Sequence, residues 1–316
     1  MPETRSRAPR LALKIDVDTY RGTLQGVPRL VEILRRFEAR ATFLFSVGPD
    51  HTGRALKRVF RPGFLKKVSR TSVASHYGLK TLLYGTLLPG PDIGQNCGEL
   101  LRSVRDGDFE VGIHSWDHVK WQDGVEKGSA AWTEELMQLA CTRFEEIFGS
   151  AAKTHGAAGW QMNAHALRLT QRLGFSYASD TRGSRPFIPV CNGEVILCPQ
   201  VPTTLPTLDE LIGIDGINPD NVHDYLLKLT EVPPPDGHVF TLHAELEGMK
   251  LAGIFERLLA GWQAQGYSLT STQDLFTSLD VDRLPHHEVV RGELPGRSGT
   301  LMLQGEEFLA PVTLTG

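Results

Sequence analysis

Four residues in two short stretches of the sequence could form a metal site with a base beside it. Asp16 and Asp18 lie in "LKIDVDT", and His114 and His118 lie in "GIHSWDH". Two imidazoles four positions apart, with one carboxylate from a distant strand, can bind a divalent cation and leave coordination positions open for water and substrate. The second aspartate would then lie beside the bound water, where a base is needed. The pattern therefore indicates hydrolytic chemistry.

Each half of this pattern is weak alone, and its context within the fold gives it weight. The chain has 11 histidines and repeats Asp-x-Asp at 106–108 and 280–282. Asp16, however, directly follows an apolar strand-like run at 11–15, and His114 directly follows the strand-like "FEVGI". Active sites of α/β proteins are built at such strand ends. The alternative interpretation is a pair of hydrogen-bonded core histidines with a capping aspartate.

Length and composition are those of an ordinary soluble globular protein. The chain has 316 residues, of which 41% are hydrophobic and 22% charged, enough for one α/β barrel or two modest domains. The four cysteines form no Cys-x-x-Cys pair, which argues against a cysteine-based zinc site and suits a reducing compartment; a Cys191–Cys198 bridge is disfavoured. Neither a secretory signal nor an apolar run long enough to span a membrane is evident. We expect a cytoplasmic protein.

The charge of the chain is distributed unevenly. Residues 51–91 contain eight lysines and arginines and no acidic residue, so the net charge of −4 leaves −12 for the rest of the chain. Apolar side chains are interleaved with these bases, a combination that suits an anionic membrane surface or a phosphate-bearing lipid. A solvated basic helix and an RNA-facing patch are the alternatives. We expect no nucleic-acid partner, because the protein as a whole is acidic.

Strand-like and helix-like segments alternate from residue 11 to about residue 280. Strands are predicted in "RLALKID", "ATFLFSV", "FEVGI", "FSYASD" and "HVFTLHAE", and the clearest helix is predicted over 130–148, closed by Gly149. This alternation favours a parallel, barrel-like α/β fold over 11–280. Within it, 51–91 would be an inserted basic segment, helical in pieces and facing the membrane. The tail, 281–316, is predicted to pack on the barrel.

The sequence resembles the polysaccharide deacetylase superfamily, which has a distorted (β/α) barrel, a first motif with two acidic residues and a second motif His-x-x-x-His. More closely, it resembles the 4-deoxy-4-formamido-L-arabinose-phosphoundecaprenol deformylases. Seven runs carry that resemblance in one order: "IDVDTYRGT", "FSVGPD", "GIHSWDH", "AAGW", "SDTRG", "VPTTLPTLDE" and "TLHAELEG". The match continues into the tail, "VVRGELPGRSG".

The resemblance implies a role for each matched residue. Asp16 aligns with the general base, Asp18 with the carboxylate ligand, and His114 and His118 with the imidazole ligands. The remaining two are His243, aligned with the general acid, and Asp180, aligned with the aspartate that orients and charges that acid. On sequence alone, His243 could equally be a packed histidine at a strand end.

One departure from the family concerns a cation near the base. The third motif of the family is Arg-x-Pro-x-Gly, whereas "AAGW" at 157–160 has no arginine. Arg182 or Arg21 could supply that cation from another loop, or Arg182 could bind the lipid phosphate.

Further side chains are candidates for contact with the sugar. Trp116, Trp121 and Trp160 could stack on it or could be core residues, and Tyr20 follows the first motif. Glu245 and Glu247 could contact the sugar or its amine, although a solvated loop is the favoured role for them.

The resemblance implies metal-dependent hydrolysis of a formamide on a sugar linked through phosphate to a polyprenol, in the modification of lipid A. The enzyme would then lie peripherally on the inner face of the inner membrane. Metal-dependent N-deacetylation of a soluble or polymeric amino sugar is the alternative. Zinc, manganese, cobalt and nickel all tolerate two imidazoles and a carboxylate, so the residues do not select one metal.

Overall fold

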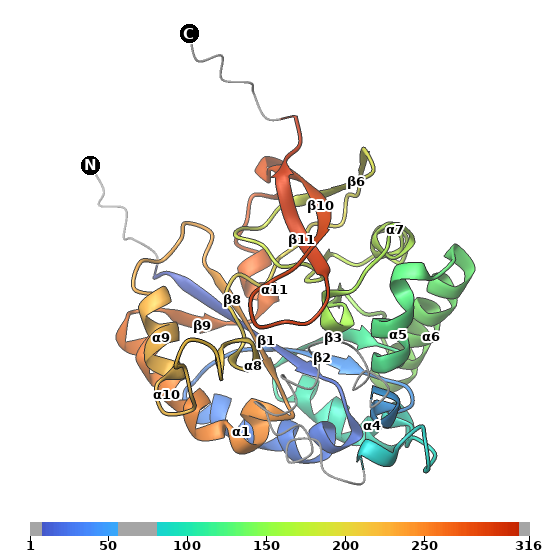
Figure 1. Cartoon of the computed structure of the whole chain (residues 1–316), viewed down its shortest axis with the longest axis horizontal. Helices are drawn as coiled ribbons and strands as arrows, with labels where there is room; N and C mark the ends of the chain where they lie inside the picture. The colour runs from blue at the N-terminus through green and yellow to red at the C-terminus, as the bar shows by residue number, and fades with distance from the viewer. Residues whose placement is uncertain (1–7, 56–80, 310–316) are drawn as a thin grey trace.

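One parallel sheet curves into an incomplete barrel and carries the site at the carboxyl ends of its strands (Figure 1). The computed structural model describes residues 8–55 and 81–309 of the chain. The strand order is β5-β4-β3-β2-β1-β8, with β9 also paired to β1, and every pairing is parallel. The strands are β1 (Arg10–Val17), β2 (Thr42–Ser46), β3 (Glu110–Ser115), β4 (Thr154–His155), β5 (Tyr177–Ala178), β8 (His238–His243) and β9 (Ser268–Thr270). The predicted parallel barrel is confirmed.

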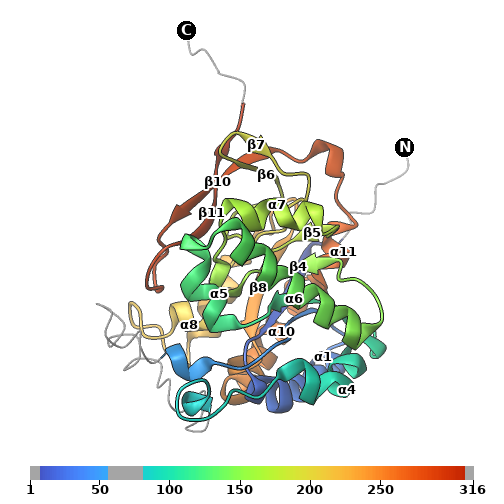
Figure 2. The same ribbon diagram turned by 90° about the vertical axis from the view of Figure 1, so that its right-hand side faces the viewer.

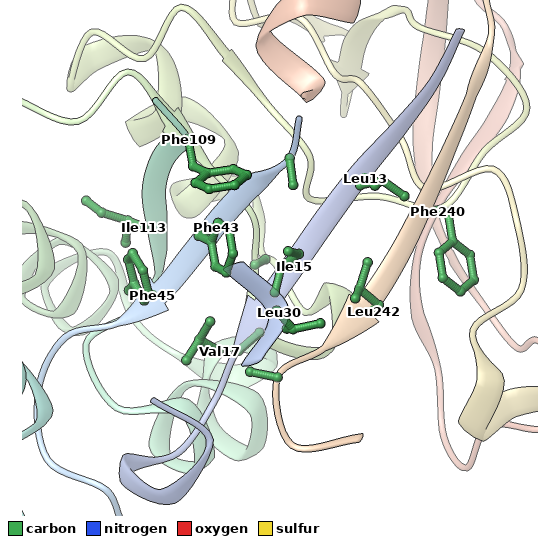
Figure 3. Close-up of a cluster of buried hydrophobic side chains, with 14 of the residues drawn as sticks. Leu13, Ile15, Val17, Leu30, Phe43, Phe45, Phe109, Ile113, Phe240 and Leu242 are labelled. Atoms are coloured by element: carbon green, nitrogen blue, oxygen red, sulfur yellow. The ribbon is translucent and has the colours of Figure 1, made fainter. Parts of the chain in front are cut away.

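The alternation of residue types along β1 separates the two faces of this sheet. Leu13, Ile15 and Val17 belong to the apolar core between the sheet and its helices, shown in Figure 3. Lys14 and Asp16 alternate with them and therefore point into the barrel. The outer face supplies the burial that holds the strands together, which leaves the inner face available for polar side chains.

Helices surround the sheet on its outer side (Figure 1). The longer ones are α1 (Val27–Arg36), α4 (Ile93–Asp106), α6 (Ala130–Phe148), α7 (Ala164–Arg172), α9 (Val222–Leu229) and α10 (Ala252–Ala264), and the shorter ones are α5 (His118–Gly124), α8 (Leu208–Leu211) and α11 (Thr272–Phe276). The Ser129 side chain caps the start of α6, and Gly149, in the left-handed conformation, ends it. The helix predicted over 130–148 is thus confirmed.

An irregular segment, residues 199–205, bridges the gap between β5 and β8. On one side the Ala178 N–H donates to the Pro199 carbonyl and the Val201 N–H to the Ala178 carbonyl, both at 2.8 Å. On the other side the Thr204 N–H donates to the Val239 carbonyl at 3.1 Å. Because Pro199 and Pro202 lack an N–H, this segment cannot form a regular strand, and the barrel is distorted here.

A second, smaller sheet has the order β11-β10-β6-β7 and lies at one end of the molecule, at the top of Figures 1 and 2. Its strands are β6 (Ile188–Cys191), β7 (Glu194–Val195), β10 (His286–Gly292) and β11 (Leu301–Glu307). Strand β11 also bonds the chain at Arg182, whose N–H donates to the Met302 carbonyl at 2.9 Å. The tail thereby brings its 293–300 loop toward the barrel. The proposed boundary between barrel and tail, at about 280, stays a prediction.

Two π-helical turns, η1 (Gly22–Gly26) and η6 (Leu246–Lys250), follow β1 and β8 and contact each other closely. A Cβ on Gly26 would lie 2.0 Å from the Ala244 carbonyl oxygen, and one on Gly248 would lie 2.7 Å from the Gly26 Cα. Only glycine permits this approach. The crossing fixes the ends of β1 and β8 relative to each other.

Much of the segment 51–91 lies outside the described residues, since 56–80 are not among them, and the prediction that it is helical in pieces concerns mostly those residues. The described part includes a short 3₁₀ turn, η3 (Thr81–Leu83), and the exposed Leu87. Among the described residues, we find no helix with the length and apolarity needed to cross a membrane. The four cysteines are free thiols.

Candidate active site

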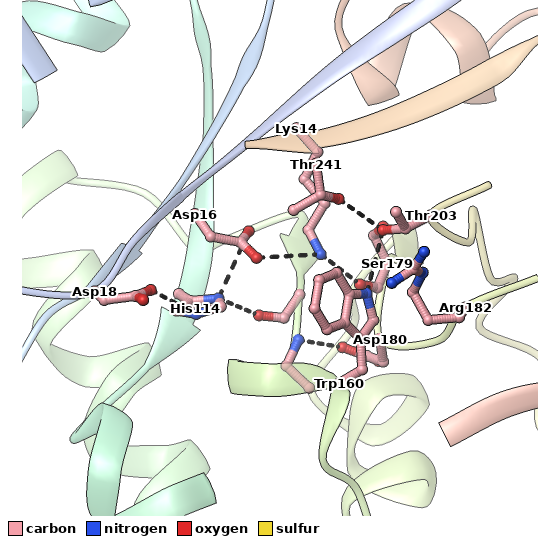
Figure 4. A network of polar contacts seen from close by, with 12 residues as sticks. Lys14, Asp16, Asp18, His114, Trp160, Ser179, Asp180, Arg182, Thr203 and Thr241 are labelled. Carbon is pink, nitrogen blue, oxygen red and sulfur yellow. Dashed lines mark hydrogen bonds and ion pairs between the residues drawn. The ribbon is translucent and has the colours of Figure 1, made fainter. Parts of the chain in front are cut away.

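The register of β1 and β8 places the predicted base and the predicted acid next to each other. Asp16 and His243 are partners on these neighbouring parallel strands, so their side chains leave the sheet on the same side. Asp18 follows at the end of β1, and His114 comes from the end of β3 (Figure 4). Four side chains from three strands thus meet at one edge of the barrel.

Asp18, His114 and His118 form a compact set of potential metal ligands. Their ligand atoms all lie within 4.8 Å of one another, with His114 Nε2 3.1 Å and His118 Nε2 3.5 Å from the Asp18 carboxylate. His118 begins α5, where the Asp117 side chain caps the helix by accepting from the Lys120 N–H at 3.0 Å. The sequence-predicted triad is therefore brought together by the fold.

The hydrogen bonding of His114 fits a cation between these residues. Its Nδ1 lies 2.7 Å from the Gly156 carbonyl oxygen, which can only accept, so Nδ1 carries the proton and Nε2 of the neutral ring is an acceptor. This acceptor faces a second acceptor, Asp18 Oδ1, which is buried and has no hydrogen-bond partner in the described part of the chain. Burial disfavours charge on Asp18, but His118 and His114 in their protonated forms outweigh it and hold the pKa of Asp18 below its ordinary value, an effect that a cation beside the neutral rings would also have. A divalent cation bound by the three side chains would satisfy both acceptors.

The cation beside the predicted base is Lys14, which sequence reasoning missed. Its Nζ lies 3.6 Å from Asp16 Oδ2 and donates to the Ser179 carbonyl at 3.0 Å (Figure 4). Lys14 is fully buried, and this burial lowers its pKa although Asp16 opposes the shift. Arg182 and Arg21, the arginines considered for this position, instead bond Glu210 and Gln25. The alternation along β1 could have identified Lys14, because it puts residues 14, 16 and 18 on one face.

His243 has an environment that favours its charged form. Burial of the ring lowers the pKa of His243, but nearby carboxylates, led by Asp209, outweigh this effect and raise the pKa to about 9. Glu247 is fully buried and accepts from the His243 N–H at 2.8 Å, and burial raises the pKa of this carboxyl to about 7. A protonated imidazole at this position could donate a proton to a leaving group.

The structure contradicts the partner expected for Asp180. This carboxylate accepts from His155 Nδ1 at 2.7 Å and from the Ala157 N–H at 2.9 Å. Asp209, from the start of α8, is the carboxylate that most raises the pKa of His243. Asp180 thus connects the chain after β5 to β4 and to the loop that follows β4. The resemblance implied His243 as the partner of Asp180, and the run "SDTRG" does not itself indicate which histidine lies beside this carboxylate.

Glu245 also differs from the solvated loop residue favoured by the sequence. It is 2% exposed and accepts from the Asp18 N–H at 3.1 Å, the Thr19 N–H at 2.9 Å and the Thr19 hydroxyl at 2.8 Å. A Cβ on Gly22 would lie 1.9 Å from the Glu245 Oε1. Glu245 therefore orients the backbone that carries Asp18.

The aromatic candidates lie in different surroundings. Trp160 is 1% exposed and donates to the Thr203 hydroxyl at 3.2 Å. Trp116 contacts Gly48 and lies 5.1 Å from the Arg143 guanidinium of α6, and its place beside the sugar stays a prediction. Trp121 is buried against the Trp132 ring, as a core residue would be. Tyr20 donates its N–H to Asp50 and is half-buried.

Solved structures of known proteins share this fold. A Mycobacterium smegmatis protein assigned as a polysaccharide deacetylase superimposes with a TM-score of 0.59 at 15% identity, covering 92% of this chain and 97% of that one. A family 4 acetyl xylan esterase from Clostridium thermocellum, solved in complex with a cobalt ion, gives 0.50 at 11% identity, covering 86% and 93%. The chain therefore has the polysaccharide deacetylase fold.

Curated relatives identify the family within that fold. A probable 4-deoxy-4-formamido-L-arabinose-phosphoundecaprenol deformylase ArnD of Shewanella sediminis is 39% identical over 296 residues, 93% of this chain and 94% of that protein. Its counterpart in Wigglesworthia glossinidia brevipalpis is 34% identical over 284 residues, 90% and 98%. No family model matches the chain. The chain belongs to the ArnD deformylase family, whose members are hydrolases acting on amide bonds.

Proposed function

We propose that this protein is a divalent-metal-dependent deformylase of 4-deoxy-4-formamido-L-arabinosyl phosphoundecaprenol, yielding the 4-amino sugar lipid and formate for the modification of lipid A. The observation that carries the proposal is the set of three ligand atoms within 4.8 Å, with Asp16 and His243 beside it on register-paired strands. The names of the curated relatives support the choice of substrate.

The chemistry requires a nucleophile from water and a proton for a poor leaving group. A divalent ion held by Asp18, His114 and His118 would lower the pKa of water and polarise the formyl carbonyl. Asp16 then takes a proton from the attacking water, whose oxygen bonds to the formyl carbon. His243 in its charged form donates a proton to the nitrogen as the C–N bond breaks, so the products are formate and a free amine. Lys14 compensates the charge of Asp16 and holds its position.

A lipid-linked substrate accounts for the composition of residues 51–91. Eight basic residues without an acidic one suit the anionic headgroups of a membrane surface. Leu87 and Leu88, 80% and 38% exposed at the end of this segment, would add apolar contact. We therefore propose that the enzyme lies peripherally on the inner face of the inner membrane.

The decisive experiment is mass spectrometry of the formamido-arabinosyl phospholipid after incubation with the protein, with and without a chelator. We expect loss of one CO unit from the lipid and release of formate only when metal is present. Asp16→Asn and His243→Ala should each abolish formate release while the bound metal, measured by elemental analysis, is retained. His223→Ala, on the outer helix α9, is the matched control and should keep full activity.

Two outcomes would overturn the proposal. Retained activity in both active-site variants would reject the assigned roles. Turnover of an N-acetylated soluble sugar in preference to the formamido lipid would instead establish the alternative, a metal-dependent N-deacetylase.

A further inference from the structure

Three cationic side chains from distant parts of the chain converge on the indole of Trp160. The Lys14 Nζ lies 5.2 Å from the ring centroid, the Arg182 Cζ 5.0 Å and the Arg297 Cζ 4.5 Å. Cations at such distances from an indole are attracted by its π-electrons. Lys14 also lies beside Asp16, so this cluster of cations is adjacent to the proposed catalytic residues.

The two arginines share one hydrogen-bonded carboxylate. Both bond the same oxygen, Glu210 Oε1, at 2.6 Å from Arg182 Nη1 and 3.1 Å from Arg297 Nη1. The other oxygen of Glu210 accepts from the Thr207 N–H that it caps. One carboxylate therefore bonds two guanidinium groups, with Asp209 of α8 as a further negative charge near Arg182.

Donor groups of both arginines remain available. Arg182 is 7% exposed; its Nη2 donates to the Leu205 carbonyl at 2.9 Å, and its buried Nε has no hydrogen-bond partner among the described residues. Arg297 makes its hydrogen bond through Nη1, and within the described residues no partner is found for its Nε or Nη2; its side chain is 13% exposed. Unpaired guanidinium donors are costly when buried, and an anionic acceptor would relieve that cost.

The position of Arg297 is fixed by the loop between β10 and β11. Gly296, with φ +81°, lies against α8, because a Cβ there would be 2.1 Å from the Glu210 carbonyl oxygen. The tail thus places Arg297 beside Arg182, at the same side of Glu210.

We propose that Arg182 and Arg297 form a subsite for the phosphate of a glycosyl phosphate, and this proposal rests on the function proposed above. A phosphodiester carries one negative charge, and its oxygens fit the guanidinium fork. In the proposed substrate the formamide and the phosphate lie at opposite ends of one sugar ring. Binding the phosphate beside Trp160 would therefore direct the formamide toward Asp16 and the metal ligands, and would make the phosphate a determinant of specificity.

The test compares a phosphorylated with an unphosphorylated substrate. In Arg297→Gln we expect the KM for the formamido-arabinosyl phospholipid to rise about tenfold or more, because one charge-assisted contact is lost, with kcat little changed. The KM for the methyl glycoside of the same formamido sugar should not change. Arg185→Gln, which removes an exposed arginine paired with Asp236, is the matched control and should leave both values unchanged. An equal rise of KM for both substrates would overturn the subsite.

Direct binding separates this proposal from the proposed function. Calorimetry with geranyl phosphate should show a rise in Kd of about tenfold or more in Arg297→Gln even if the wild-type protein releases no formate. Inorganic phosphate, measured in parallel, distinguishes a site for free phosphate from one for a lipid phosphate. Equal geranyl phosphate affinity in wild type and variant, at equal melting temperature, refutes the subsite.

A second variant keeps the test valid if Arg297→Gln does not fold. Glu210→Gln preserves the capping geometry, since glutamine also serves at this position, and removes the compensating charge. We expect it to bind geranyl phosphate more tightly than the wild type does. Unchanged or weaker binding in folded Glu210→Gln would contradict a phosphate that competes with Glu210 for these two arginines.

Discussion

Replacement of Asp209 by asparagine tests how the structure charges the proposed general acid. Asp209 contributes most to raising the pKa of His243 to about 9, against the opposing effect of burial. His243 is protonated below that pKa and neutral above it, so activity that depends on the charged ring is lost as pH rises through about 9. The substitution keeps the shape of the side chain and the Thr207 hydroxyl as its neighbour.

The magnitude follows from the loss of one nearby opposite charge. Such a charge shifts a pKa by roughly one to three units, and Asp209 is partly exposed to solvent, which places the effect at the lower end. We therefore expect the alkaline limb of the kcat profile to move down by about one pH unit, equivalent to about 1.4 kcal/mol. Formate release at saturating substrate, followed from about pH 7 to about pH 10, measures it.

Asp180→Asn provides the contrasting variant. Its carboxylate bonds His155 and the Ala157 N–H, so we expect lower stability and an unmoved alkaline limb. If the limb moves in Asp180→Asn and stays in place in Asp209→Asn, the assignment made from the structure is refuted and the one implied by the family resemblance is restored.

Three further predictions concern stability. Lys14→Met should lower the free energy of unfolding by about 3 kcal/mol, because it leaves buried Asp16 without its cation, while Lys14→Arg should lose less; urea denaturation checks both. Phe43→Ala should cost about 3 to 5 kcal/mol by the same measurement, because the ring is fully buried in the core. Burial raises the pKa of Asp274, but hydrogen bonds and Arg40 lower it more, so Asp274→Asn should be less stable than wild type at neutral pH. This difference should vanish as pH falls through the folded-state pKa; a difference that persists in acid would contradict the sign.

The parts of the fold that follow from local patterns could be predicted from the sequence. The apolar alternation of 11–17 and the long helix closed by Gly149 are signals contained within a few turns of chain. The metal triad was also predictable, since Asp18 and the histidines lie directly after strand-like runs that a parallel sheet brings to one edge. The periodicity of apolar residues and the positions of strand ends were sufficient to predict this strand, this helix and this triad.

Features that depend on contacts between distant segments could not be predicted. The bond between Asp180 and His155 depends on the packing of β4 beside β5, and Arg297 meets Trp160 across more than a hundred residues. The bridging segment 199–205 has no periodicity because its prolines interrupt the strand pattern. Lys14 is the exception among the residues missed, since the alternation along β1 that puts Asp16 and Asp18 on one face also includes it.

The residues proposed for the reaction and the arginine proposed for substrate selectivity lie on separate parts of the fold, because the two glycine-bearing turns after β1 and β8 fix only the former. Gly26 and Gly248 lock together the strand ends that carry Asp16 and His243, whereas Arg297 arrives on a hairpin added after the last barrel strand. Sequence changes in that hairpin can therefore alter which anion the protein binds without changing the distance between Asp16 and His243. Laboratory evolution of new substrate ranges should begin in the tail.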